Sequence, residues 1–136
     1  MAELTQDRNT MRREGAGLTL GIAASTKVFA GGIACRNATG YAVPGSTSTT
    51  LKALGAFQAQ ADNSAGGDGG KMAQIRKGTF CFGNSASTDA ITIADIGNDC
   101  YIVDDQTVAK TSGTSTRSVA GTVADVDSTG VWVTFA

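Results

Sequence analysis

The sequence predicts a small all-β domain, a single β-barrel or sandwich, preceded by a flexible N-terminal arm. First, 18 of the 136 residues are glycine, about twice the usual share, and Thr, Ser and Val are plentiful. Second, short strand-like runs recur about every 8–12 residues with turn signals between them. Third, 41% of the residues are hydrophobic and the formal net charge is −1, which is not the composition of a disordered chain.

Residues 1–16 differ from the rest and are interpreted as the arm. They hold six charges that sum to zero, with Leu4 and Met11 as large apolar side chains. Such a segment buries too little apolar surface to fold alone. We expect it to be mobile, or a short helix over residues 3–13, and to order on a partner surface; a frayed terminus is the alternative. Arginines suit carboxylates, so the candidate partner-binding residues are Leu4, Arg8, Met11, Arg12 and Arg13.

Residues 17–136 form the predicted β domain. Its strongest hairpin signal is a pair of valine-rich runs around residues 127–130, which places Val131, Val133 and Phe135 on one face. The glycine-rich stretch 63–70 is expected to be the most flexible loop.

Two further segments carry local predictions. Residues 36–40 predict a hairpin turn in which Gly40 supplies a positive φ. Phe57 is expected to face the core from the strand region that follows. Residues 49–54 also show a weak helical spacing, so a short helix there is an alternative.

No catalytic constellation is found. The chain contains no histidine, which removes the usual general base and the commonest metal ligand. The glycines of 66–70 lack the Lys-Ser/Thr of a phosphate loop. Four aspartates within eleven residues lack the closing Glu of a calcium loop and are interpreted as turn and strand-edge acids: Asp95, Asp99, Asp104 and Asp105. We expect no enzyme, no metal and no cofactor.

The remaining features argue against other compartments and partners. Cys35, Cys81 and Cys100 have no metal or redox spacing and are expected to be reduced, buried thiols of a protein made in a cytoplasm. The N-terminus has no apolar signal core, and no apolar run nears the roughly 20 residues of a membrane span. The basic pair Arg76-Lys77 near two phenylalanines is too small a cluster for nucleic acid.

Several stretches of residues 17–136 carry a family resemblance. They read AASTKVFAGGIAC, ATGYAV, LKALGAFQAQAD, RKGTFCF, NDCYIVDDQTV and RSVAGTVADVDSTGVWVTF. On these stretches the body resembles the small β-barrel capsid decoration (cement) proteins of tailed bacteriophages. The motifs are structural glycines and β-branched runs, and the arm is the least typical part.

The resemblance implies a barrel-like protein, made in the cytoplasm of the bacterial host, that sits on the outer surface of a phage head. There it would bind the major capsid protein, commonly as a homotrimer, and stabilise contacts between capsid subunits. It implies no catalytic residue. The near-neutral charge and the lack of a long apolar run separately lead us to expect no nucleic-acid and no membrane partner, and we expect no cofactor. Low charge and small side chains suit closely packed symmetric interfaces.

Two other functions remain open. One is another virion component, such as a head-fibre base, a tail-tube protein or a connector. The other is a ligand- or carbohydrate-binding β module, which needs exposed aromatic side chains. Its candidates are Tyr41, Tyr101 and Trp132, and Trp132 is expected to face outward because it alternates with Val131 and Val133.

Overall fold

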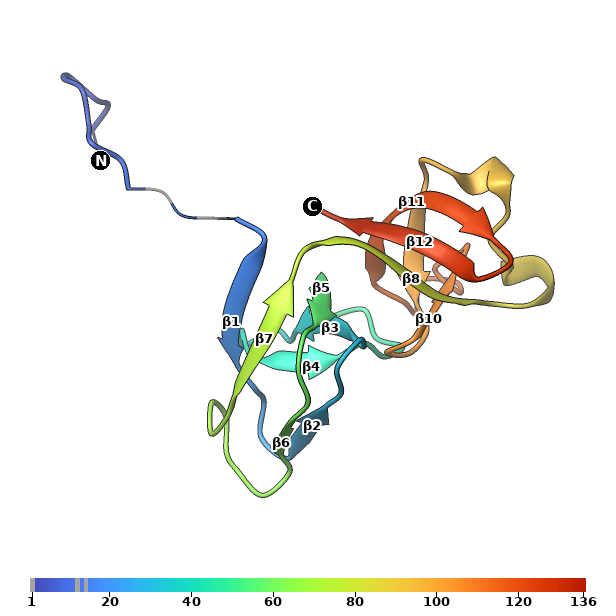
Figure 1. The fold of residues 1–136 in the computed structure, drawn as a ribbon, viewed down its shortest axis with the longest axis horizontal. Helices are drawn as coiled ribbons and strands as arrows, with labels where there is room; N and C mark the ends of the chain where they lie inside the picture. Colours follow the sequence, from blue (N-terminus) through green and yellow to red (C-terminus); the bar gives the residue numbers. More distant parts are fainter. Residues whose placement is uncertain (1, 12, 14) are drawn as a thin grey trace.

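The chain is all-β in a computed structural model that describes residues 2–11, 13 and 15–136 (Figure 1). These residues form strands β1 to β12 and two one-turn 3₁₀ helices, η1 and η2. The predicted fold class is therefore confirmed. The strands are arranged as an open sheet, a closed barrel and a small two-stranded sheet.

The N-terminal sheet is antiparallel and has the order β1-β7-β5-β3-β4. Ile22, just after β1, forms a parallel bridge to Ala42 in β4, so the sheet curls back on itself. A two-stranded sheet of β2 and β6 lies beside it. The strands are β1 (Gly17–Gly21), β2 (Thr26–Val28), β3 (Ile33–Arg36), β4 (Ala42–Pro44), β5 (Lys52–Phe57), β6 (Ala61–Asn63) and β7 (Met72–Arg76).

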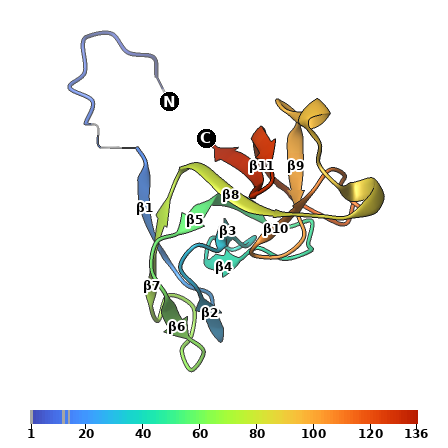
Figure 2. The same ribbon diagram turned by 45° about the vertical axis from the view of Figure 1, so that its right-hand side comes forward.

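The C-terminal half is a closed five-stranded barrel of order β10-β8-β12-β11-β9 (Figure 2). β8 leads directly from the sheet into it, and pairing of β9 with β10 closes it. Its elements are β8 (Gly78–Asn84), η1 (Ser87–Asp89), η2 (Ile93–Asp95), β9 (Asp99–Ile102), β10 (Thr107–Ala109), β11 (Val119–Asp127) and β12 (Gly130–Phe135).

The middle of the sheet lies between two hydrophobic cores. Successive side chains of a strand point to opposite faces. Cys35 and Ala56 accordingly belong to the same buried cluster as the barrel interior, which includes Val131 and Val133. The other face carries a second cluster, which includes Ala34, Phe57, Ile75 and Ile22. Sheet and barrel therefore share one core.

The local turn predictions are confirmed. β11 and β12 form the C-terminal hairpin, and Val131, Val133 and Phe135 are buried. Gly40 has a φ of 96° in the turn between β3 and β4. The side-chain oxygen of Asn37 accepts the backbone N–H groups of Thr39 and Tyr41 and fixes that turn. Phe57 is buried as predicted.

Two alternatives that the sequence left open are not found. Residues 49–54 hold no helix, because β5 pairs with β3 and β7 and this pairing outweighs a weak helical spacing. The described residues of 3–13 form no helix either. Within the loop 63–70, for which flexibility stays a prediction, the buried amide of Asn63 donates to the carbonyl oxygen of Gly67 at 2.9 Å and to two carbonyls just after β1.

Candidate interaction surfaces

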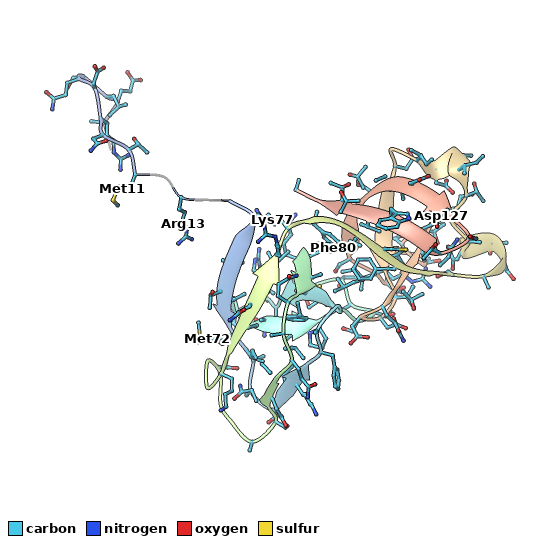
Figure 3. All side chains as sticks on the ribbon, viewed as in Figure 1. Met11, Arg13, Met72, Lys77, Phe80 and Asp127 are labelled. Atoms are coloured by element: carbon cyan, nitrogen blue, oxygen red, sulfur yellow. The ribbon has the colours of Figure 1, made fainter. Side chains whose placement is uncertain are left out.

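The arm extends away from the body. Leu4 is 74% exposed and Met11 is 94% exposed, and Figure 3 shows Met11 and Arg13 on the segment that leaves the sheet. Within the described residues 2–11, the one hydrogen bond is local, from the Thr10 N–H to the Arg8 carbonyl oxygen at 3.0 Å. Two apolar anchors are thus presented to solvent without a partner in the body. The remaining predicted arm residue, Arg12, lies outside the described residues.

Three cations surround the base of the arm: Arg13, Arg76 and Lys77. We call them the root patch. Arg76 lies opposite Gly17 in the β1–β7 pairing, so no neighbouring side chain covers it from β1. Arg13 and Arg76 line an open groove of about 370 Å³, together with Thr19, Gln58 and Gln74. Among the described residues, no carboxylate forms an ion pair with any of the three cations.

A second surface lies on the hairpin of β11 and β12 and consists of Asp125, Asp127 and Trp132, which we call the hairpin patch. Asp125 lies directly opposite Trp132 across the two strands. The Trp132 indole N–H donates to the Asp127 carboxylate at 3.0 Å. This carboxylate also accepts the backbone N–H groups of the turn. Hydrogen bonds from the Thr129 backbone and then from the Trp132 indole hold the pKa of Asp127 below its usual value.

The predicted outward orientation of Trp132 agrees with this geometry, since its flanking valines are buried and its own side chain is only half-buried. Tyr41, Tyr101 and Trp132 lie on three different elements, the turn before β4, β9 and β12. No single strand therefore presents the aromatic row that a carbohydrate-binding module commonly uses.

Two other barrel acids, Asp89 and Asp95, have structural roles. Asp95 is buried, and its carboxylate accepts the backbone N–H of Thr92 in a capping box at η2. Lys110 lies 4.0 Å from Asp95. Arg117 pairs with Asp89 at 3.3 Å, and the hydroxyl of Thr111, which donates to Asp89, contributes most to lowering the pKa of that carboxyl. Within the described part of the chain, no group of three or more metal-ligating side chains converges.

The cysteines behave mostly as predicted. All three are free thiols, and Cys35 and Cys100 are buried. Burial raises the pKa of Cys35 to about 12 and that of Cys100 to about 11. The expectation was wrong for Cys81, which is only half-buried because it points outward from β8 next to Trp132.

The two halves of the body carry opposite formal net charges, a feature that the near-neutral total conceals. Residues 17–77 carry six cations against two acids, a net charge of +4. Residues 78–136 carry two cations against seven acids, a net charge of −5. The charges of the arm cancel. Counting charges along the sequence finds this asymmetry once the boundary between sheet and barrel is known.

Comparisons of the chain with protein-family models, with curated proteins and with solved structures gave no match. No helix in the described residues combines the length and the hydropathy that crossing a bilayer requires.

Proposed function

We propose that this chain is a non-enzymatic assembly protein. More narrowly, we propose a decoration protein on the outer surface of a tailed-phage head, where it binds the major capsid protein and stabilises contacts between capsid subunits. The proposal includes self-association, as a homotrimer, and no nucleic-acid or membrane partner.

The exposed arm is the observation that carries the proposal. Met11 and Leu4 present large apolar side chains to water on a segment that forms no hydrogen bond or ion pair with the body, as far as residues 2–11 are concerned. Exposed apolar anchors on an extended terminal segment are typical of chains that order on a partner. The body offers a compact β scaffold, and its sequence motifs resemble those of decoration proteins.

Co-sedimentation with phage heads that lack this protein tests the proposal. We expect the protein to bind in a fixed ratio to capsid subunits. The double variant Leu4→Ser/Met11→Ser should bind at least about tenfold more weakly, because it loses two buried apolar contacts. The matched control Gln6→Ala/Asn9→Ala changes two polar arm residues and should bind like the parent.

Failure of the parent protein to bind heads would refute the decoration function. A glycan screen, with Trp132→Ala as its control, would then test the ligand-binding alternative. Assembly into rings or spikes without head binding would favour another virion component. If the Leu4/Met11 variant bound as tightly as the parent, the two apolar anchors would not be the contact. Unchanged affinity after deletion of residues 2–14 would exclude the whole arm, including its arginines.

A further inference from the structure

The barrel has an excess of carboxylates that no cation of its own neutralises. Both of its cations are engaged internally, Lys110 with Asp95 and Arg117 with Asp89. Within the described residues, five barrel acids therefore have no ion-pair partner: Asp99, Asp104, Asp105, Asp125 and Asp127. Asp125 and Asp127 stand out among them because they flank an aromatic side chain.

The hairpin patch has the chemistry of a receptor for a cation. The indole of Trp132 is held in place by its hydrogen bond to Asp127, and Asp125 lies opposite it on β11. An ammonium or guanidinium group over the face of a tryptophan gains a cation–π attraction, and neighbouring carboxylates add to it. Tryptophan also recurs at the energetic centres of protein interfaces.

The root patch has the complementary chemistry. Arg13 and Arg76 line one open groove, Arg13 and Lys77 line a second hollow, and both share Leu18. No described carboxylate pairs with any of the three cations. Consecutive Arg76 and Lys77 lie where β7 passes into β8 and are exposed. Clustered like charges without counter-charges repel one another, so an acidic partner surface would relieve this repulsion.

The two patches of one chain cannot meet. Gly78, next to Lys77, pairs with Phe135 at one end of the β8–β12 ladder. Trp132 pairs with Cys81, which is four residues along β8 from Lys77, a separation of roughly 13 Å along the strand. Figure 3 shows Lys77 and Asp127 at opposite ends of this ladder. A hairpin patch that meets this root patch must therefore belong to another molecule.

We infer that the root patch of one copy binds the hairpin patch of a second copy, with Arg76 and Lys77 seated against Trp132, Asp125 and Asp127. Each copy carries one patch of each kind, so the contact can be repeated around a closed assembly or made twice in a pair. The inference deepens the self-association in the proposed function, on which it rests, by naming the surfaces that meet.

Sedimentation velocity of the purified full chain, without phage heads, tests the contact. At about 50 mM salt we expect a mass above the 13.7 kDa of one chain, and dissociation towards that mass at about 500 mM salt, because the contact is electrostatic. Asp125→Lys and, separately, Arg76→Glu/Lys77→Glu should each weaken association by about tenfold or more, since attraction becomes repulsion. The controls Asp99→Lys and Lys52→Glu/Lys71→Glu make the same charge changes at other exposed positions and should associate like the parent.

Mixing the variants gives the decisive result. The Asp125→Lys chain keeps an unchanged root patch and the Arg76→Glu/Lys77→Glu chain keeps an unchanged hairpin patch. An equal mixture can therefore form the native contact and should associate more strongly than either variant alone. Recovery in the mixture also shows that both variants are folded.

A monomeric parent at low salt, an Asp125→Lys variant that associates normally, or a mixture without recovery would each overturn the inference. None of these results depends on capsid binding, so failure here is distinct from failure of the co-sedimentation experiment. A protein that self-associates through other surfaces and still binds heads would leave the proposed function standing without this contact.

Discussion

At the scale of single residues, Asn63 shows how one buried amide orders a glycine-rich loop. Its side chain is 2% exposed, and its amide nitrogen lies 3.2 Å from the Ile22 oxygen, 3.0 Å from the Ala23 oxygen and 2.9 Å from the Gly67 oxygen. A Cβ atom at Gly66 would lie 2.1 Å from its side-chain oxygen. The glycine leaves the space that the amide occupies, and the amide adds to the backbone hydrogen bonds of the loop, such as those from Gly69 to Ile22 and from Gly70 to Gly67.

The substitution Asn63→Ala should lower the free energy of unfolding by about 1–3 kcal/mol, because the Ala23 carbonyl loses its side-chain donor. The Ile22 and Gly67 carbonyls keep the backbone N–H groups of Gly69 and Gly70. Urea denaturation followed by tryptophan fluorescence measures this change. Asn9→Ala in the arm is the matched control and should be neutral. A loss as small as that of the control would mean that water replaces the amide.

At the scale of elements, β11 is the longest strand of the barrel and pairs with β12 on one side and β9 on the other. Its register shifts once along each partner, between Val123 and Asp125 and between Val119 and Gly121. Such irregularities bend a strand, which a barrel of five strands requires. Gly121 adds a close approach, since a Cβ atom there would lie 2.4 Å from the Thr134 carbonyl oxygen.

We expect Gly121→Ala to destabilise the protein by about 1–3 kcal/mol, because the added methyl group pushes β12 away from β11. The control Gly17→Ala adds the same methyl group in edge strand β1, where nothing lies within 4 Å, and should change stability little. Thermal unfolding of both variants gives the comparison. Equal melting temperatures would show that the barrel absorbs the methyl group by shifting.

The element scale also shows what sequence can predict. The β11–β12 hairpin was predictable because its turn and its alternating valines are adjacent in the chain. The absence of a helix at 49–54 was not predictable from the sequence, because β5 forms as a strand by pairing with β3 and β7, which lie far away in the sequence.

The candidate surfaces also differ in how far the sequence alone predicts them. The exposure of the arm anchors Leu4 and Met11 follows from composition. The root patch required the fold, since only the β1–β7 pairing brings Arg76 beside the base of the arm. The hairpin patch was predictable only in part, because the sequence predicts the outward orientation of Trp132 but not its hydrogen bond to Asp127.

At the scale of the whole molecule, the shared core joins sheet and barrel. Cys35 comes from the sheet strand β3 and Cys100 from the barrel strand β9, yet both belong to one buried cluster. If either the sheet or the barrel unfolded, the apolar side chains that the other contributes to this cluster would become exposed to water. The two halves should therefore unfold together.

Thiol labelling across a urea gradient tests this coupling. In the native state Cys35 and Cys100 should not react at about pH 8, because burial blocks access and raises their pKa values to about 12 and about 11. Both should become reactive at the same urea midpoint, read by mass spectrometry, with the half-buried Cys81 as the native-state reference. Labelling of Cys100 at lower urea than Cys35 would show that the barrel opens by itself.

The separation of the arm from the body has a kinetic consequence. Residues 2–16 could span roughly 50 Å when extended, so the arm and the body can hold a surface at two distant points. Once one point is bound, the other faces its target at an effective concentration of about a millimolar. The molecule then leaves only when both points release within the same short interval, so two individually weak contacts can give a long residence time while each one still exchanges rapidly.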